Sequence, residues 1–141
     1  MAIHYHPDQG VILLCDYSNG FTPPEMTKRR PVIVLSPKIQ ARPHLCTVVA
    51  LSTTPPQKPM PYHCEIDLPF DMPKPFNAKT VWIKGDMVNA VGFQRLDLIR
   101  GNKGKDGKRY YLNTPVGNDI LKCVRECVLR GMGLSTLTKH L

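Results

Sequence analysis

Fourteen prolines divide this chain of 141 residues into short apolar runs, and no other feature of the sequence limits the fold as strongly. Proline lacks the backbone N–H group that a sheet requires, so it occurs at strand ends and in turns. Short apolar runs between such breaks are typical of small β-rich domains rather than of long helices. The sequence predicts five strands: Gly10 to Tyr17, Pro31 to Leu35, Thr47 to Ser52, Tyr62 to Leu68 and Thr80 to Phe93.

The fifth predicted strand is long enough to bend, and Gly85 and Gly92 are its candidate bulge or bend positions. Four prolines between residues 55 and 61 predict a stiff, extended connection from the third strand to the fourth. The segment "GNKGKDGKRY", residues 101–110, combines glycine with charge. It is predicted to be an exposed, mobile loop.

One helix is predicted towards the C-terminus. Apolar residues recur at steps of three and four from residue 116 to residue 128, which is the spacing of one helix face. Thr114 is the predicted N-cap, Pro115 suits the first helical position, and Gly131 is expected to end the helix.

These elements predict a mainly β (α+β) fold, in which a small, twisted, mainly antiparallel sheet or partial barrel carries a C-terminal helix. The length suits a single domain over residues 1–141, and 42% hydrophobic residues can fill its core. A mean hydropathy of −0.23 and the lack of any apolar run of bilayer length argue against a membrane protein. The opening "MAIHYHPDQG" lacks the pattern of a signal peptide, so a cytoplasmic protein is expected.

The charge balance points to a polyanionic partner. Nineteen Lys and Arg against eleven Asp and Glu give a net charge of +8. The cations cluster at residues 28–30 and again between residues 95 and 109. Clustered cations favour a nucleic acid, an acidic protein segment or an anionic surface as partner, over a role in general solubility.

The five cysteines are expected to be reduced and to pack as small apolar residues. Cys123 and Cys127 continue the apolar face of the predicted helix. Two other segments add potential metal ligands: His44-x-Cys46 and His63-Cys64. Because no CxxC pair exists and the acidic residues are scattered, no metal site is expected.

Other catalytic motifs are absent from the sequence. It contains no phosphate-binding glycine loop and no nucleophile elbow. His4 and His6 lie in a terminus that is expected to be frayed, and His63 is expected to be structural or on the surface.

Polar residues suited to catalysis gather at the predicted strand ends. Glu25 and Arg30 flank one short loop, and Arg30 directly precedes the second strand, which would fix its backbone. Ser52, Thr53 and Thr54 place hydroxyl groups where the third strand ends.

The fifth strand carries Thr80, Lys84 and Asp86 at even spacings, so a regular strand would turn all three to one side. Together with the loop and hydroxyl residues they could form one site at the edge of a small barrel. A solvated rim with ordinary ion pairs would have the same spacing, and spacing alone leaves both interpretations open.

Five segments, in this order, resemble a known family: "QGVILLCDY", "PEMTKRRPVIVLSP", "TVVALSTTPP", "PYHCEI" and "VWIKGDMVNAVGFQRLD". The family is that of the growth-arresting toxins MazF, PemK and Kid of bacterial type II toxin–antitoxin pairs. The resemblance runs from Gly10 to the helix near Arg130.

The resemblance implies a small SH3-like barrel with a C-terminal helix, a homodimer, and an RNA groove built from both subunits. It implies a metal-independent endoribonuclease without a cofactor that cuts single-stranded RNA, including mRNA, at short sequences. The RNA 2′-hydroxyl attacks the neighbouring phosphorus and leaves a 2′,3′-cyclic phosphate and a 5′-hydroxyl. Such chemistry needs a base, an acid and stabilisation of the charge on phosphorus.

The resemblance also assigns residues to these roles. Arg30 maps to the central arginine, whose guanidinium suits a phosphorane. Ser52 maps to a hydroxyl that contacts the scissile phosphate, and Glu25 to a base or base-positioning residue. Asp86 and Thr80 map to residues that one branch of the family uses for base chemistry and substrate contact.

Two departures leave the general base undecided between Glu25 and Asp86, and leave the acid unassigned. Lys84 stands where that branch has arginine, and Pro24 stands where it has histidine. Lysine keeps the charge but not the planar fork. The residues expected to bind RNA are Lys28, Arg29, Thr53, Thr54, Thr80 and Lys84.

The implied protein partner is a cognate antitoxin whose disordered acidic segment covers the groove, and the pair is expected to bind DNA.

Two other functions compete with the nuclease. A gyrase-targeting toxin related to CcdB would need an aromatic residue near the C-terminus, whereas this chain ends "STLTKHL". A non-catalytic nucleic-acid-binding module would need exposed aromatics for base stacking. Its candidates are Phe21, Tyr62, Trp82 and Phe93, of which Trp82 is expected in the core.

Overall fold

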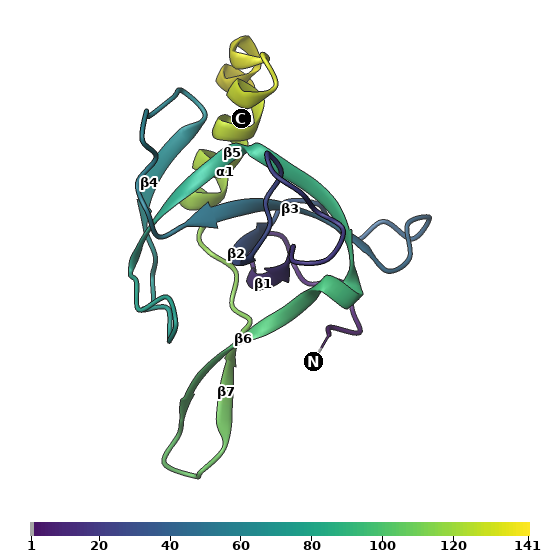
Figure 1. Ribbon diagram of the computed structural model, residues 1–141, viewed down its shortest axis with the longest axis vertical. Helices are drawn as coiled ribbons and strands as arrows, with labels where there is room; N and C mark the ends of the chain where they lie inside the picture. Colours follow the sequence, from purple (N-terminus) through teal and green to yellow (C-terminus); the bar gives the residue numbers. More distant parts are fainter. Residues whose placement is uncertain (1) are drawn as a thin grey trace.

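The computed structural model describes residues 2–141, apart from the side chain of residue 102, as a mainly β molecule with one α-helix (Figure 1). Its elements in chain order are β1 (Ile12–Asp16), β2 (Arg29–Val34), β3 (Leu45–Ser52), β4 (His63–Asp67), β5 (Thr80–Gly92), η1 (Phe93–Arg95), β6 (Leu96–Lys103), β7 (Arg109–Leu112), α1 (Asn118–Gly131) and η2 (Ser135–His140). Within the described residues, no helix is long and apolar enough to cross a membrane.

All seven strands belong to one antiparallel sheet in the order β4-β5-β3-β2-β1-β6-β7. The predicted fold class is therefore confirmed. The sheet is not closed, because β4 and β7 end it at opposite edges. Of the two expected forms, a partial barrel or a twisted sheet, the structure has a strongly bent open sheet, and the β6–β7 hairpin extends away from the rest of the molecule (Figure 1).

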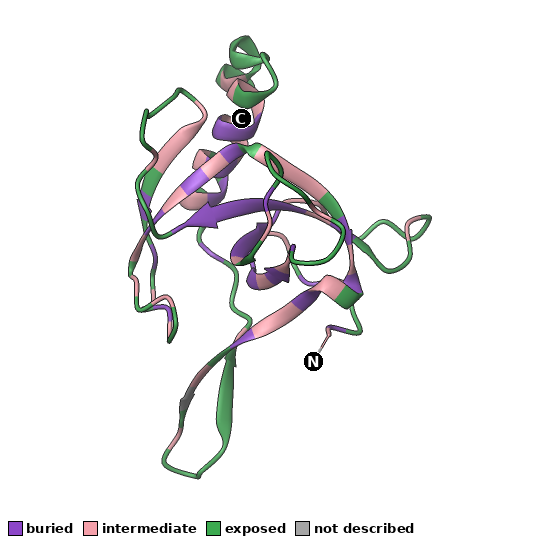
Figure 2. Cartoon of the chain, viewed as in Figure 1, coloured by how far each residue is buried: buried purple, intermediate pink, exposed green. Residues whose placement is uncertain are grey.

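The central strands bury both faces of the sheet (Figure 2). Alternate residues point to opposite faces, so a strand covered on both sides becomes a continuous apolar run. One face carries the helix-side core, which includes Ile33, Val49 and Ile83 together with Val124 of α1. The other face carries the inner core, which includes Leu13, Cys15, Tyr17, Val32, Ala50 and Phe93.

The long strand β5 contains a bulge, as its glycine predicted. Ala50 pairs with Lys84 while the adjacent Val49 pairs with Val88, so residues 85–87 have no partners on β3. Gly85 is required here because a Cβ atom at this position would lie 2.4 Å from the backbone carbonyl of Cys127. The bulge therefore lets α1 pack directly on the β5 backbone.

The helix begins later than predicted. Its N-cap is Gly117, not Thr114, and its first residue is Asn118. The backbone N–H of Val116 donates to the carbonyl of Gly10 at 3.0 Å, which holds the preceding residues extended against the start of β1. A tertiary hydrogen bond thus overrides local helix-start signals.

The predicted loop over residues 101–110 is wrong in part, because much of it forms the β6–β7 hairpin. Only the tip around Gly104 and Gly107 is a turn, closed by a hydrogen bond from Gly107 N–H to the Gly104 carbonyl. Residues of β7 are mostly exposed, so hydrophobic patterning gives little signal there.

The N-terminus is held in place rather than frayed. Ala2 forms a bridge with Asp97, and the N–H of Ile3 donates to the carbonyl of Leu96 at 3.0 Å. The Ile3 side chain is buried in the inner core. The histidines at positions 4 and 6 are therefore on ordered backbone.

Candidate functional site

A row of polar and aromatic residues crosses the sheet where β2 begins and β3 ends. Ser52 pairs with Trp82 of β5, and Cys15 of β1 pairs with Arg30. Continuing the β2–β3 register by two residues from the pair Val32 and Ala50 brings Arg30 level with Ser52. Residues directly opposite in antiparallel strands share a face, so the Arg30–Ser52–Trp82 row lies on the inner-core face.

Arg30 has an unsatisfied nitrogen inside the protein. Among the described residues, two buried side-chain polar atoms have no hydrogen-bond partner: Arg30 Nε and the Tyr17 hydroxyl. Buried polar groups are nearly always paired, so an unpaired guanidinium nitrogen needs an explanation. A ligand oxygen at the end of the row would supply the missing acceptor.

Tyr17 lies at the same end of the sheet. Its side chain is fully buried, and burial raises the pKa of its hydroxyl well above the usual range. The nearby Arg30 charge acts in the opposite direction. The phenol lies near the Cys15 thiol and Arg30 without a hydrogen bond of normal geometry to either, so it is a protonated donor without a partner among the described residues.

Ser52 is buried and already has two hydrogen bonds. Its hydroxyl donates to the carbonyl of Thr54 at 2.9 Å and accepts from the Thr54 N–H at 3.1 Å. These bonds fix the turn that leaves β3. The Ser52 hydroxyl has one proton, so its hydrogen bond to the Thr54 carbonyl must break before Ser52 can donate to a phosphate. Thr53 lies in the same turn and is exposed.

Glu25 lies in the loop that connects β1 to β2. The loop packs on the inner-core face, because Met26 is buried there and Phe21 meets the Tyr17 ring edge-on at 5.1 Å. The Glu25 N–H donates to the Thr22 carbonyl at 2.9 Å. Within the described chain, its exposed carboxylate forms no hydrogen bond or ion pair, so the structure does not join Glu25 to Arg30 directly.

The residues of β5 separate into two groups. Thr80 and Lys84 keep the even spacing before the bulge, where they pair with Asp67 and His63 of β4. The Thr80 hydroxyl donates to Asp67 Oδ1 at 2.9 Å. Asp86 falls in the unpaired segment, so the regular alternation that was expected to align it with the other two does not hold.

The basic cluster at residues 28–30 is divided between the faces of the sheet. Arg29 pairs with Asp16, whose pKa is lowered by hydrogen bonds from Ser18 and by the Arg29 charge. Being adjacent to Arg30 in a strand, Arg29 projects to the opposite face. There it lines a cavity of about 350 Å³, in which Arg29, Lys74 and Arg100 outnumber the one acidic residue, Asp97. Lys28 precedes β2 and is exposed.

Sequence reasoning missed Tyr17 and misplaced Trp82. Trp82 is half-buried in the row beside Ser52 and belongs to neither core cluster, so its expected place in the core is wrong. The sequence did contain a signal for this position, because Trp82 is two residues from Lys84 and the two side chains therefore share one face of the strand. Tyr17 ends the first apolar run, but only the tertiary structure brings its hydroxyl to Arg30.

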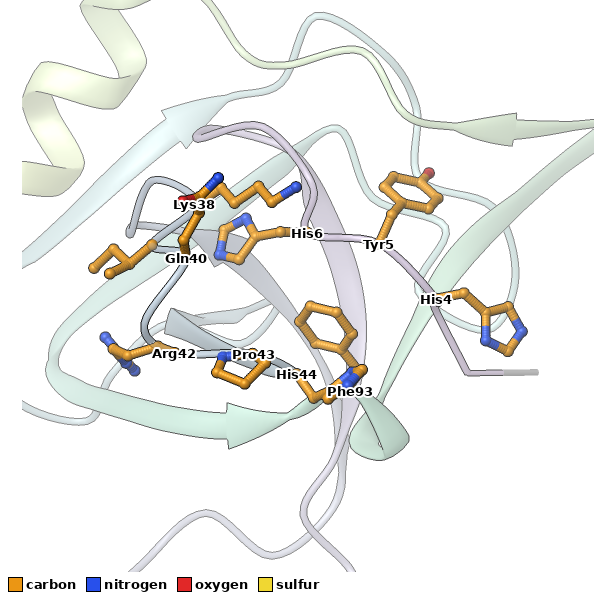
Figure 3. A pocket seen from close by; sticks show the side chains of 10 residues that line it. His4, Tyr5, His6, Lys38, Gln40, Arg42, Pro43, His44 and Phe93 are labelled. Carbon is orange, nitrogen blue, oxygen red and sulfur yellow. The ribbon is translucent and has the colours of Figure 1, made fainter.

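A second cavity of about 350 Å³ lies at the other end of β3 (Figure 3). Its wall includes His6, His44 and Arg42 near the ring of Phe93, and His4 lies further along the N-terminal segment with its ring directed away from Phe93. The rings of His6 and His44 meet Phe93 edge-on, with centroids 6.2 and 5.7 Å away. Because Leu45 begins β3 and Ser52 ends it, this cavity is separate from the Arg30–Ser52–Trp82 row.

Burial makes the thiols poor nucleophiles. It raises the pKa of Cys15 and of Cys46 to about 11, and the pKa of Cys123 to about 12. Because the thiolate is the reactive form, none of these three cysteines fits a nucleophilic role at neutral pH. Cys64, Cys123 and Cys127 nevertheless lie together, which the sequence did not lead us to expect.

Comparison with known proteins decides the family. The sequence profile described as "PemK-like, MazF-like toxin of type II toxin-antitoxin system" matches residues 8–122. The chain belongs to this family. It is also 31% identical over 160 aligned positions to the uncharacterized protein YifN of Escherichia coli (strain K12), with 97% of this chain and 99% of that protein covered. An uncharacterized protein of Haemophilus influenzae is 30% identical, with 97% of this chain and 98% of that protein covered.

Solved structures of MazF toxins share the fold. MazF from Deinococcus radiodurans superposes with a TM-score of 0.61 at 20% identity, covering 92% of this chain and 99% of that one. An endoribonuclease in complex with its cognate antitoxin, from a mycobacterial species, gives a TM-score of 0.58 at 18% identity, covering 91% and 96%. At these identities the likeness establishes the mainly β architecture with its C-terminal helix.

Proposed function

We propose that this MazF/PemK-family chain is a metal-independent, sequence-specific endoribonuclease toxin that cuts single-stranded RNA. The observation that carries the proposal is the buried, unpartnered Nε of Arg30 beside Ser52 and Trp82. A guanidinium with a free donor suits a phosphate oxygen, and an indole at the end of the row suits a stacked base. The row holds a cation and a hydroxyl rather than the converging carboxylates of a two-metal nuclease.

The proposed reaction is attack of the RNA 2′-oxygen on the adjacent phosphorus. A base removes the 2′-hydroxyl proton, the new oxygen–phosphorus bond forms, and the bond to the 5′-oxygen breaks with return of a proton. Arg30 stabilises the charge that develops on the phosphorane oxygens, and does so at any working pH because guanidinium does not deprotonate. The products are a 2′,3′-cyclic phosphate and a 5′-hydroxyl.

Glu25 is the base that we favour over Asp86. The Glu25 loop packs on the inner-core face and leads directly into Arg30. Asp86 lies in the bulge against the end of α1, since a Cβ atom added at Gly131 would lie 3.2 Å from the Asp86 Cα.

The test is cleavage of a single-stranded RNA library in EDTA, with the ends of the products mapped. Arg30→Ala should lower the cleavage rate by several orders of magnitude while the circular dichroism spectrum is retained. Arg30→Lys should also be strongly impaired, because it keeps the charge but not the fork. Glu25→Gln should lose ~10²–10⁴-fold, the usual contribution of a general base, and Asp86→Asn much less.

Arg125→Ala is the matched control, because it removes the same charge from α1 on the other face of the sheet. It should cleave at the wild-type rate. Wild-type cleavage by a folded Arg30→Ala protein would refute the site assignment. Intact RNA with the wild-type protein, despite tight binding, would favour a non-catalytic binding module.

The proposal includes two partners: a second copy of the chain and an antitoxin with an acidic segment. The basic cavity lined by Arg29, Lys74 and Arg100 is the surface that we assign to the acidic segment. Its charge complements that segment, so the affinity should fall as the salt concentration rises. A homodimer would give twice the mass of one chain in light scattering, and a single-chain mass would contradict it.

A further inference from the structure

Three cysteines from two different elements meet on the helix side of the sheet. They are Cys64 of β4 and Cys123 and Cys127 of α1. Their sulfur atoms all lie within 4.8 Å of one another, and the sulfurs of Cys123 and Cys64 are 2.9 Å apart. No step of the proposed cleavage reaction uses these residues.

The secondary structure directs all three side chains to one point. Cys64 pairs with Ile83, a residue of the helix-side core, so its side chain faces α1. Cys123 and Cys127 are four residues apart in a helix and therefore share a face. The cluster thus joins the edge strand β4 to the helix that crosses it.

The surroundings offer sulfur ligands with access from solvent. Cys127 is fully buried, whereas Cys64 and Cys123 are half-buried, so two of the three cysteines are partly exposed to solvent. The Glu126 carboxylate next to it binds Arg130 at 3.3 Å. His63 is adjacent to Cys64 in the strand and points to the other face, where its Nδ1 accepts the Met60 N–H.

We propose that Cys64, Cys123 and Cys127 form a binding site for one thiophilic d¹⁰ cation, Zn²⁺ or Cu⁺, which fastens β4 to α1. Three thiolates without a hard ligand select soft cations. Sulfur atoms bound to tetrahedral Zn²⁺ at ~2.3 Å lie about 3.8 Å from one another, a value that small side-chain rotations would reach here. Cu⁺ would need the three thiolates alone, whereas Zn²⁺ would complete its shell with a solvent ligand.

The proposed site is structural and lies on the face of β4 and β5 opposite to the Arg30–Ser52–Trp82 row. Binding should therefore raise the thermal stability of the folded chain, because the unfolded chain lacks the preformed cluster. A disulfide between Cys64 and Cys123 is the competing interpretation. It would require an oxidant and would leave Cys127 without a role.

The experiment uses the full chain, purified with a phosphine reductant and stripped of metal. Zn²⁺ and Cu⁺ are titrated separately against chromophoric chelators of known affinity. Co²⁺ serves as the spectroscopic probe for Zn²⁺, because thiolate-to-cobalt charge-transfer bands report sulfur ligation. We expect one cation per chain, a cobalt–thiolate spectrum and a higher Tm with the cation that binds.

Cys64→Ser and Cys123→Ser should each weaken binding at least tenfold and abolish the Tm increase. Both side chains are half-buried, so a hydroxyl is tolerated in the fold. Cys46→Ala is the matched control, since it removes a thiol from the inner core and should leave the stoichiometry unchanged. Binding that is absent from the wild type, or that survives in both serine variants, would overturn the proposal. A Cys64–Cys123 disulfide would also overturn the proposal if mass spectrometry finds it in protein purified without reductant and it persists when the redox-inert Zn²⁺ is present throughout purification.

Discussion

At the scale of single residues, the position of Arg30 explains why one cation of a basic cluster is special. Pro31 follows it, and its pairing with Cys15 fixes its backbone in the sheet. Its side chain projects to the inner-core face, where Nε finds no acceptor in the described chain. Arg29 has the same chemistry but projects to the other face. Strand alternation, not residue type, therefore separates a candidate catalytic cation from a candidate docking cation.

Ser52 gives the first prediction at this scale. Ser52→Ala removes two hydrogen bonds that fix the turn at Thr54. We expect a loss of about 1 kcal/mol in the free energy of unfolding, measured in urea, and faster amide exchange at Thr54. Cleavage should fall by roughly ten- to a hundredfold, the value of one hydrogen bond to a charged group.

Thr53→Ala is the control for this variant, because Thr53 is exposed in the same turn. It should change neither stability nor amide exchange by much. If Ser52→Ala alters exchange at Thr54 but cleaves RNA at the wild-type rate, Ser52 is a turn residue and not a phosphate ligand.

At the scale of elements, the bulge in β5 determines both how α1 packs and where the site ends. Residues 85–87 leave the β3 ladder, and the backbone of Gly85 lies against the backbone of Cys127. The same interruption removes Asp86 from the alternation of Thr80 and Lys84. The bulge at Gly85 therefore changes the position of Asp86, one of the two carboxylates between which the sequence left the choice of general base open.

Gly85→Ala should destabilise the protein strongly. An added Cβ would lie 2.4 Å from the Cys127 carbonyl carbon and oxygen, and backbone atoms cannot yield as a flexible side chain can. The loss in the free energy of unfolding should reach or exceed the upper end of the ~1–3 kcal/mol typical of overpacking. Urea denaturation measures it.

Gly117→Ala is the comparison, since a Cβ at Gly117 meets no atom within 4 Å. Loss of the glycine N-cap should cost at most about 1 kcal/mol. Equal effects of the two substitutions would show that α1 does not pack on the bulge as described.

At the scale of the whole molecule, the net charge of +8 includes two groups of cations on opposite faces of the sheet. Arg30 and Lys84 belong to the cleavage site that we propose on the inner-core face. Arg29, Lys74 and Arg100 line the cavity on the other face, which also includes Asp97. An RNA and an acidic protein segment could therefore be bound by different surfaces of one small sheet.

Binding of an acidic peptide tests this division. A glutamate-rich peptide carrying a fluorophore should bind the wild-type chain with an affinity that falls as NaCl rises, measured by fluorescence anisotropy. Lys74→Glu combined with Arg100→Glu should weaken binding at least tenfold. Lys139→Glu, at the exposed end of η2, should have little effect. Binding without salt dependence, or unchanged by the double substitution, would contradict the assignment.

The elements that could be predicted from the sequence are those whose residues are apolar or are bounded by proline. The five predicted strands match β1 to β5, and Gly85 marks the observed bulge. The strands β6 and β7 were missed for different reasons. The first half of β6 is apolar and partly buried, with Leu96 and Ile99 in the core, but it follows β5 after only three residues and was not separated from it in the sequence. The residues of β7 are mostly exposed, so they give no burial pattern. The helix start was misplaced because a hydrogen bond from Val116 to Gly10 outweighs the local capping signal.

The candidate site was predictable in composition but not in arrangement. Sequence alone identified Arg30, Ser52 and Glu25, and left the base open between Glu25 and Asp86. Tyr17 and Trp82 joined the site only when strand pairing placed them in or beside the row. Pairing partners are remote in the chain, and no local pattern records which residues will be opposite one another.

By itself, then, the sequence determined the mainly β class, the family, the basic charge and Arg30 at the start of a buried strand. These depend on composition, spacing and motifs that are local to the chain. The tertiary structure alone decided that Arg29 and Arg30 face opposite ways, that Asp86 lies in a bulge and that three distant cysteines meet. Each of these depends on strand register or on a backbone approach between elements, and such contacts are set by long-range packing rather than by neighbouring residues.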